Sequence, residues 1–98
     1  RGMSGWLVIA TLRFRDIERY RAYQASFPAV FAKHQGRVLA ADETPEPLEG
    51  DVVDKVVVMQ FPTEDAARAF VNCPEYREIS KDRIAGAETN SWLVKALG

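Results

Sequence analysis

The segment between residues 61 and 76 reads Phe61-Pro-Thr-Glu-Asp-Ala-Ala-Arg-Ala-Phe-Val-Asn-Cys-Pro-Glu-Tyr76. It follows directly on the β-rich run Val56-Val-Val-Met-Gln60, so a strand is predicted to lead at once into an amphipathic helix. Thr63 is the expected N-cap, and the acidic residues that follow it suit the positive end of the helix dipole. Pro74 ends this helix, and a second helical segment is expected over residues 75–85. A strand and a broken helix thus form the second half of a small α+β domain.

The rest of the chain supplies a matching first half. A helix is expected from the N-cap Asp16 to a stop at Gly36, because apolar residues recur at steps of three and four up to His34. Pro28 predicts a kink or restart within it. The expected strands cover residues 6–13, 37–41, 52–61 and 89–95, and a loop covers residues 42–51. The order strand, helix, strand, strand, helix, strand predicts a ferredoxin-like βαββαβ sandwich with a four-stranded antiparallel sheet.

Length and charge limit the classes of protein. The chain has 98 residues, and we expect one domain over residues 3–98, with Arg1 and Gly2 as a cloning remnant before Met3. Thirteen basic and fourteen acidic residues provide no positive field, so neither nucleic acid nor an anionic membrane is an expected partner. No apolar run approaches the roughly 20 residues of a membrane span. A single cysteine forms no internal disulfide, which favours a cytoplasmic protein.

The size of the chain also favours association. A domain this small buries only about two-thirds of the surface of its unfolded chain, so a monomer has marginal stability. The hydrophobic fraction of 47% is ample for the core of one domain. A partner subunit would therefore take up the surplus apolar surface.

A set of residues along nearly the whole chain keeps the order and spacing of one bacterial family. The set comprises Tyr20, Tyr23, the segments 34–39 and 48–50, Phe61-Pro-Thr63, Ala66, Ala67, Pro74-Glu-Tyr76 and Arg83. The chain resembles the domain of unknown function 1330 family, within the dimeric α/β-barrel superfamily. The resemblance implies a homodimer whose two sheets pack face to face into a barrel. It also implies a cavity for a small organic ligand between the sheet and the helices, and it implies no particular reaction.

Three residues are the candidates for catalysis. His34 is the one histidine and would serve as general acid or base; alternatively, it stabilises a helix C-terminus through the dipole. Arg83 would hold a substrate carboxylate or enolate, unless it forms an ion pair with the acidic loop or a neighbouring glutamate. Glu49, beside Gly50, would orient His34 or accept a proton, although a carboxylate there also suits hydrogen bonds to backbone amides of its own loop.

Aromatic residues and a second arginine are the candidates for substrate binding. Tyr20, Tyr23 and Tyr76 would line the cavity, and core packing explains them equally well because large rings dominate small cores. Arg37 would bind an anionic group of the substrate, with a structural ion pair as the favoured alternative.

The residues favour one class of chemistry over others. No phosphate-binding glycine loop, nucleophile elbow or zinc-binding helix motif occurs, and one His with one Cys does not make a closed zinc site, so neither metal nor cofactor is expected. The hypothesis is a protein that binds or transforms a small organic molecule, by cofactor-free proton transfer if it is an enzyme. The alternative is a non-catalytic binding or assembly module.

Overall fold

The computed structural model describes residues 5–98. Its elements are β1 (Trp6–Phe14), α1 (Ile17–Phe31), β2 (Arg37–Asp42), β3 (Lys55–Phe61), α2 (Glu64–Asn72), α3 (Pro74–Gly86) and β4 (Ala87–Lys95). The expected order is confirmed, and the helix that breaks at Pro74 forms the pair α2 and α3. The expected cloning remnant and the start of the domain at Met3 lie outside the described residues.

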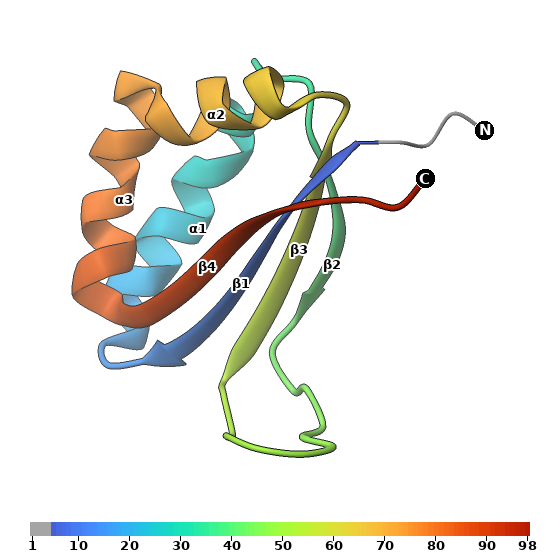
Figure 1. The fold of residues 1–98 in the computed structure, drawn as a ribbon. Coiled ribbons are helices and arrows are strands. Elements are labelled where there is room, and N and C mark those ends of the chain that lie inside the picture. The colour runs from blue at the N-terminus through green and yellow to red at the C-terminus, as the bar shows by residue number, and fades with distance from the viewer. Residues whose placement is uncertain (1–4) are drawn as a thin grey trace.

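The sheet has the topology of the ferredoxin-like fold. Its strand order is β2-β3-β1-β4, and every neighbouring pair is antiparallel. Figure 1 shows α1, α2 and α3 on the same side of the sheet, so no helix of residues 5–98 covers the other side. None of the helices in the described part of the chain is long and apolar enough to cross a membrane.

Side-chain caps begin the helices where the sequence predicts them. The Asp16 carboxylate accepts a hydrogen bond from the Arg19 amide at 3.3 Å, and the Thr63 hydroxyl accepts one from the Ala66 amide at 3.0 Å. At the junction of α2 and α3, the Cys73 sulfur accepts a hydrogen bond from the Tyr76 amide at 3.3 Å. Pro74 occupies the first turn of α3, where no backbone N–H is needed. The break therefore starts a new helix and places Tyr76 in its first turn.

Some boundaries differ from the expected ones. One helix runs through Pro28 without a restart and ends at Phe31, before His34. A Cβ atom on Gly36 would lie 2.5 Å from the Phe61 ring and 2.8 Å from the Phe31 ring. Gly36 thus serves close packing against the core, not a helix stop, and the chain leaves the helix early to reach that position. β3 begins at Lys55 instead of residue 52, and β4 begins two residues earlier than expected.

The core lies between the sheet and the helices in two clusters. The first contains Val8, Val30, Met59, Phe61, Ala67 and Phe70, and the second contains Leu12, Tyr20, Tyr23 and Ala87. Phe61 and Phe70 are fully buried and stack with ring centroids 5.7 Å apart. The second cluster is the more polar of the two because it includes the hydroxyls of the candidate residues Tyr20 and Tyr23.

The uncovered side of the sheet is also apolar. In β1, Val8 and Leu12 are buried under the helices, so Ile9 between them points to the other side. Ile9 pairs with Val58 of β3 and with Trp92 of β4, whose side chain is 53% exposed. We call this surface, centred on Ile9, Val58 and Trp92, the open face. It carries large apolar side chains that no helix in the described part of the chain covers.

Candidate functional site

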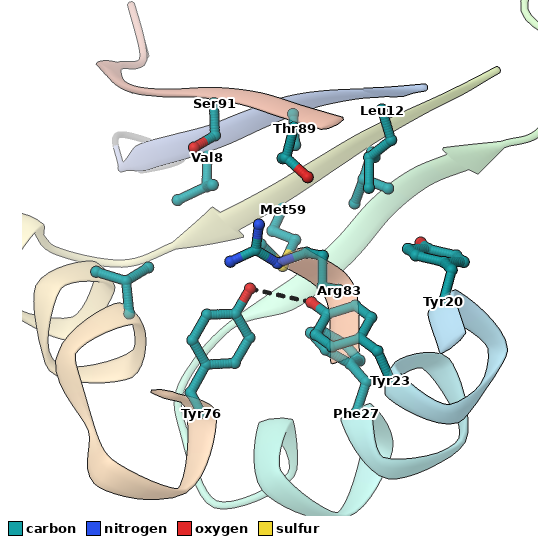
Figure 2. Close-up of a pocket in the computed structure, with 13 residues that line it drawn as sticks. Val8, Leu12, Tyr20, Tyr23, Phe27, Met59, Tyr76, Arg83, Thr89 and Ser91 are labelled. Carbon is teal, nitrogen blue, oxygen red and sulfur yellow. Dashed lines mark hydrogen bonds between the residues drawn. The ribbon is translucent and has the colours of Figure 1, made fainter. Parts of the chain in front are cut away.

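A cavity of about 190 Å³ lies between the sheet and the helices. Figure 2 shows its wall, which combines apolar side chains of the central strands with tyrosines of α1 and α3 and polar side chains of β4. The lining residues are Val8, Ala10, Leu12, Tyr20, Tyr23, Phe27, Val57, Met59, Val71, Tyr76, Arg83, Thr89 and Ser91. A mostly apolar cavity with a few converging polar groups is the usual form of a small-molecule site.

Two tyrosine hydroxyls meet in this cavity. Tyr23 comes from α1 and Tyr76 from α3, and their hydroxyl oxygens lie 3.0 Å apart (Figure 2). Burial raises the pKa of Tyr23, the neighbouring Tyr76 hydroxyl raises it further, and the Arg83 charge lowers it by less. The raised pKa keeps the Tyr23 hydroxyl protonated near neutral pH. Tyr23 therefore offers a hydrogen bond to a ligand and does not supply a base.

Arg83 brings a positive charge to the same cavity. Its guanidinium carbon lies 5.8 Å from the centre of the Tyr23 ring, and Figure 2 shows the side chain reaching towards the two hydroxyls. Among residues 5–98, the buried Nε of Arg83 and the buried hydroxyl of Thr89 find no hydrogen-bond partner. Within residues 5–98, no carboxylate forms an ion pair with Arg83. Buried donors without partners are costly, so a ligand oxygen that accepts from them would bind favourably.

The other sequence candidates lie elsewhere. His34 follows α1 in a turn, and its ring packs edge-on against Phe70 with centroids 5.2 Å apart. Glu49 is exposed in the loop between β2 and β3, and Arg37 is exposed and donates to the Gln60 side chain at 3.2 Å. None of the three lines the cavity, whereas Tyr20, Tyr23, Tyr76 and Arg83 do. The expected grouping of His34 with Glu49 and Arg83 is therefore not found, because the early end of α1 directs His34 to the other core cluster.

One buried lysine, Lys55, is not among the candidates that the sequence suggested. Lys55 begins β3, is 4% exposed, and lines a second cavity of about 150 Å³. Its Nζ lies 4.9 Å from the centre of the Tyr20 ring and 3.3 Å from a carboxylate oxygen of Glu43. Strand alternation provided a signal, because Lys55 falls on the same face as the buried residues Met59 and Phe61.

Glu43 links this lysine to an arginine at the surface. Both carboxylate oxygens of Glu43 accept short hydrogen bonds from the Arg21 guanidinium, at 2.6 and 2.7 Å. The hydrogen bond from Arg21, with a smaller contribution from Lys55, lowers the pKa of Glu43 to about 2. Glu43 is therefore ionised at neutral pH, and its charge is shared between two cations.

The described residues place no three His, Cys, Asp or Glu side chains where they could hold a metal ion together. The polar side chains that line the two cavities are instead phenols, one amide, hydroxyls, a lysine and an arginine. These groups suit an oxygen-bearing organic molecule, because they donate hydrogen bonds and carry positive charge.

Comparison with known proteins agrees with the fold. The family model described as a domain of unknown function, DUF1330, matches residues 5–97. No curated protein matches the chain significantly. The RPA0582 protein of unknown function from Rhodopseudomonas palustris is 23% identical, with a TM-score of 0.82 over 97% of this chain and 84% of its own.

Two further solved structures share the fold at lower identity. A dimeric protein of unknown function with a ferredoxin-like fold, from Bacteroides fragilis NCTC 9343, is 13% identical, with a TM-score of 0.67 over 98% of both chains. SnoaB from Streptomyces nogalater, described as a cofactor-independent oxygenase, is 15% identical, with a TM-score of 0.67 over 97% of this chain and 95% of its own. At these identities the likeness concerns the fold alone.

Proposed function

The chain belongs to the DUF1330 family, and we propose that its cavity binds a small, largely apolar organic molecule through an acidic or enolisable oxygen. One observation carries the proposal: an arginine with an unpartnered buried Nε lies beside a hydroxyl pair in an apolar cavity. Arg83 provides the positive charge that an anionic oxygen requires, and Tyr23 and Tyr76 provide neutral hydrogen bonds. The apolar lining takes the rest of the molecule.

The chemistry that this site favours is the stabilisation of negative charge on the ligand. In a cavity shielded from water, an arginine and a phenol lower the energy of an enolate or carboxylate more than solvent-exposed groups do. The proton of an enolisable ligand would become more acidic at this position. SnoaB, which shares the fold, is described as a cofactor-independent oxygenase, so the fold is compatible with reactions on organic molecules that use no cofactor.

A second candidate function is binding without turnover. It is favoured by the side chains of the cavity wall, which include no histidine and no carboxylate. Because the pKa of Tyr23 is raised, that hydroxyl is a poor proton acceptor near neutral pH. In this function Arg83 and the hydroxyl pair select an anionic ligand and perform no chemistry on it.

Arg83→Gln tests the anion site, with benzoate and its neutral isostere benzamide as probes. Wild-type protein is expected to bind benzoate more tightly than benzamide, and the variant to lose roughly ten- to a hundredfold in benzoate affinity, because a hydrogen bond to a charged group is lost. Benzamide affinity should change little. Isothermal titration calorimetry measures both, and circular dichroism checks the fold of the variant.

Arg77→Gln is the matched control, because Arg77 lies on the same helix, is exposed and donates hydrogen bonds to Asn72. It should bind benzoate like the wild type. Equal benzoate affinity in wild type and Arg83→Gln, or no binding of benzoate to either, would contradict the proposed site.

We further propose that the protein forms a homodimer through the open face. The dimeric state of the Bacteroides fragilis structure and the uncovered apolar side chains of Ile9, Val58 and Trp92 support it. Contiguous exposed apolar patches of this kind mark association surfaces.

Ile9→Glu should convert the dimer to a monomer, because two carboxylates would be buried without partners at the centre of the interface. Sedimentation velocity at micromolar protein concentration measures the change. Ile84→Glu is the control, since Ile84 is 59% exposed on α3, away from the open face. A dimeric Ile9→Glu protein, or a monomeric wild type, would refute this interface.

A further inference from the structure

Lys55 is placed to contact a ligand at a second point. Its side chain is only 5% exposed, and it lines the cavity of about 150 Å³ with Tyr20, Tyr23 and Phe27. Burying an ammonium group is costly unless its charge and its three N–H donors find partners. Glu43 accepts one of these donors at 3.3 Å, and the Tyr20 ring faces the cation at 4.9 Å. Lys55 therefore retains hydrogen-bonding capacity in an apolar cavity.

The charges around Lys55 leave this position net positive. Glu43 makes its shortest contacts with Arg21, at 2.6 and 2.7 Å, so Lys55 shares the single negative charge of Glu43 with that arginine. Arg21, Lys55 and Glu43 together carry one excess positive charge. Arg83 carries another in the first cavity, and the wall of neither cavity includes an acidic side chain.

The two cavities adjoin one another. Both are lined by Tyr20, Tyr23, Phe27 and Val57, so the Lys55 side and the Arg83 side share these four side chains. The rings of Tyr20 and Tyr23 lie 5.6 Å apart, with Lys55 over the first and Arg83 over the second. The surface between the two cations is thus aromatic and apolar.

We propose that the two cavities form one elongated site for an organic molecule with an acidic group at each end. One acidic group binds Arg83 and the Tyr23–Tyr76 hydroxyl pair, the other binds Lys55, and the apolar middle of the molecule lies along Tyr20 and Phe27. The inference rests on the proposed function, because Arg83 holds the first acidic group there, and it adds the class of ligand: a dicarboxylate or a related diacid.

Straight-chain carboxylates test the second contact. Wild-type protein is titrated calorimetrically with α,ω-dicarboxylates from glutarate to azelate and with the monocarboxylates of equal length, from pentanoate to nonanoate. One length of dicarboxylate is expected to bind about tenfold more tightly than its monocarboxylate, because the distal carboxylate gains a charged hydrogen bond. In Lys55→Met the preference should reverse, since the distal group then meets only apolar atoms.

Two variants control for structure. Glu43 keeps its two bonds to Arg21 in Lys55→Met, so no carboxylate is left unpaired. Lys55→Gln keeps a polar side chain without the charge. This variant should abolish the preference for the dicarboxylate. Lys33→Met removes an exposed lysine that pairs with Glu75, and it should preserve the preference of the wild type. Thermal unfolding confirms that each variant is folded.

The outcomes separate the inference from the proposed function. A wild type that binds every dicarboxylate no better than its monocarboxylate, or a preference that persists in Lys55→Met and Lys55→Gln, overturns the inference and leaves the anion site at Arg83 intact. If monocarboxylate affinity is unchanged in Arg83→Gln, or if neither class of probe binds, the proposed function fails and the inference fails with it.

Discussion

Phe70→Ala is expected to lower the free energy of unfolding by about 3–5 kcal/mol, the range for truncating a large buried ring. Phe70 is fully buried and lies at the centre of an aromatic cluster, with ring centroids 4.3 Å from Tyr76, 5.2 Å from Phe31 and 5.7 Å from Phe61. These rings are held by different elements and cannot close together over the space that the alanine leaves. Since small domains are stable by only about 5–15 kcal/mol, much of the protein's stability would be lost.

Urea unfolding followed by circular dichroism, at a fixed protein concentration, measures the effect. Phe70→Leu is the matched control, because it keeps most of the buried volume and should cost less than half as much as the alanine. Equal losses of unfolding free energy in the two variants would show that the contacts of the aromatic ring, and not the buried volume, determine the stability. A loss below about 1 kcal/mol in Phe70→Ala would contradict the packing described for this cluster.

Gly86→Ala is expected to lower the free energy of unfolding by about 3 kcal/mol, the upper end of the range for overpacking a well-packed core. The added Cβ atom would lie 2.5 Å from the backbone nitrogen of Tyr20 and 2.8 Å from the carbonyl oxygen of Asp16. Both are backbone atoms, so rotation of a side chain cannot relieve the clash with the added Cβ atom. The carbonyl of Gly86 also accepts hydrogen bonds from the amides of Arg15 and Asp16, at 2.8 and 3.0 Å. Separating the end of α3 from the start of α1 would weaken these bonds as well.

Gly50→Ala is the matched control for this substitution. Gly50 has a φ angle of +86°, and a Cβ atom added there would meet no other atom within 4 Å. Its cost is therefore limited to the strain of about 1–2 kcal/mol that an L-residue meets in this backbone conformation. Urea unfolding compares the two variants. A Gly50→Ala protein less stable than Gly86→Ala would contradict the close contact between α1 and α3.

Local patterns were sufficient to predict the order of the elements. The cap at Thr63 and the break at Pro74 depend on chemistry within one or two turns, and both are found where they were expected. The end of α1 depends instead on a distant contact, the packing of Gly36 against the ring of Phe61. The sequence near His34 gives no sign of that contact, so it predicts a helix that continues up to Gly36. In the structure α1 ends at Phe31, and the His34 ring packs against Phe70.

The grouping of side chains was harder to predict than their identity. Tyr23, Tyr76 and Arg83 were candidates from the sequence, but their convergence depends on how α1 and α3 pack together. Lys55 was overlooked because lysine is rarely buried, although the alternation of β3 places it on the covered face. Its burial depends on the Tyr20 ring and on Glu43, which lie 35 and 12 positions away along the chain.

Alternate residues of the central strand β1 contribute to two surfaces, the cavity on one side of the sheet and the open face on the other. Val8, Ala10 and Leu12 line the cavity, while Ile9 points to the open face. Inserting or deleting one residue in such a strand turns every following side chain to the opposite side. The same event would place polar or ill-fitting groups in the cavity and replace the side chains of the open face. Evolution can therefore vary β1 by substitution at either surface, but a change in its length would destroy both surfaces together.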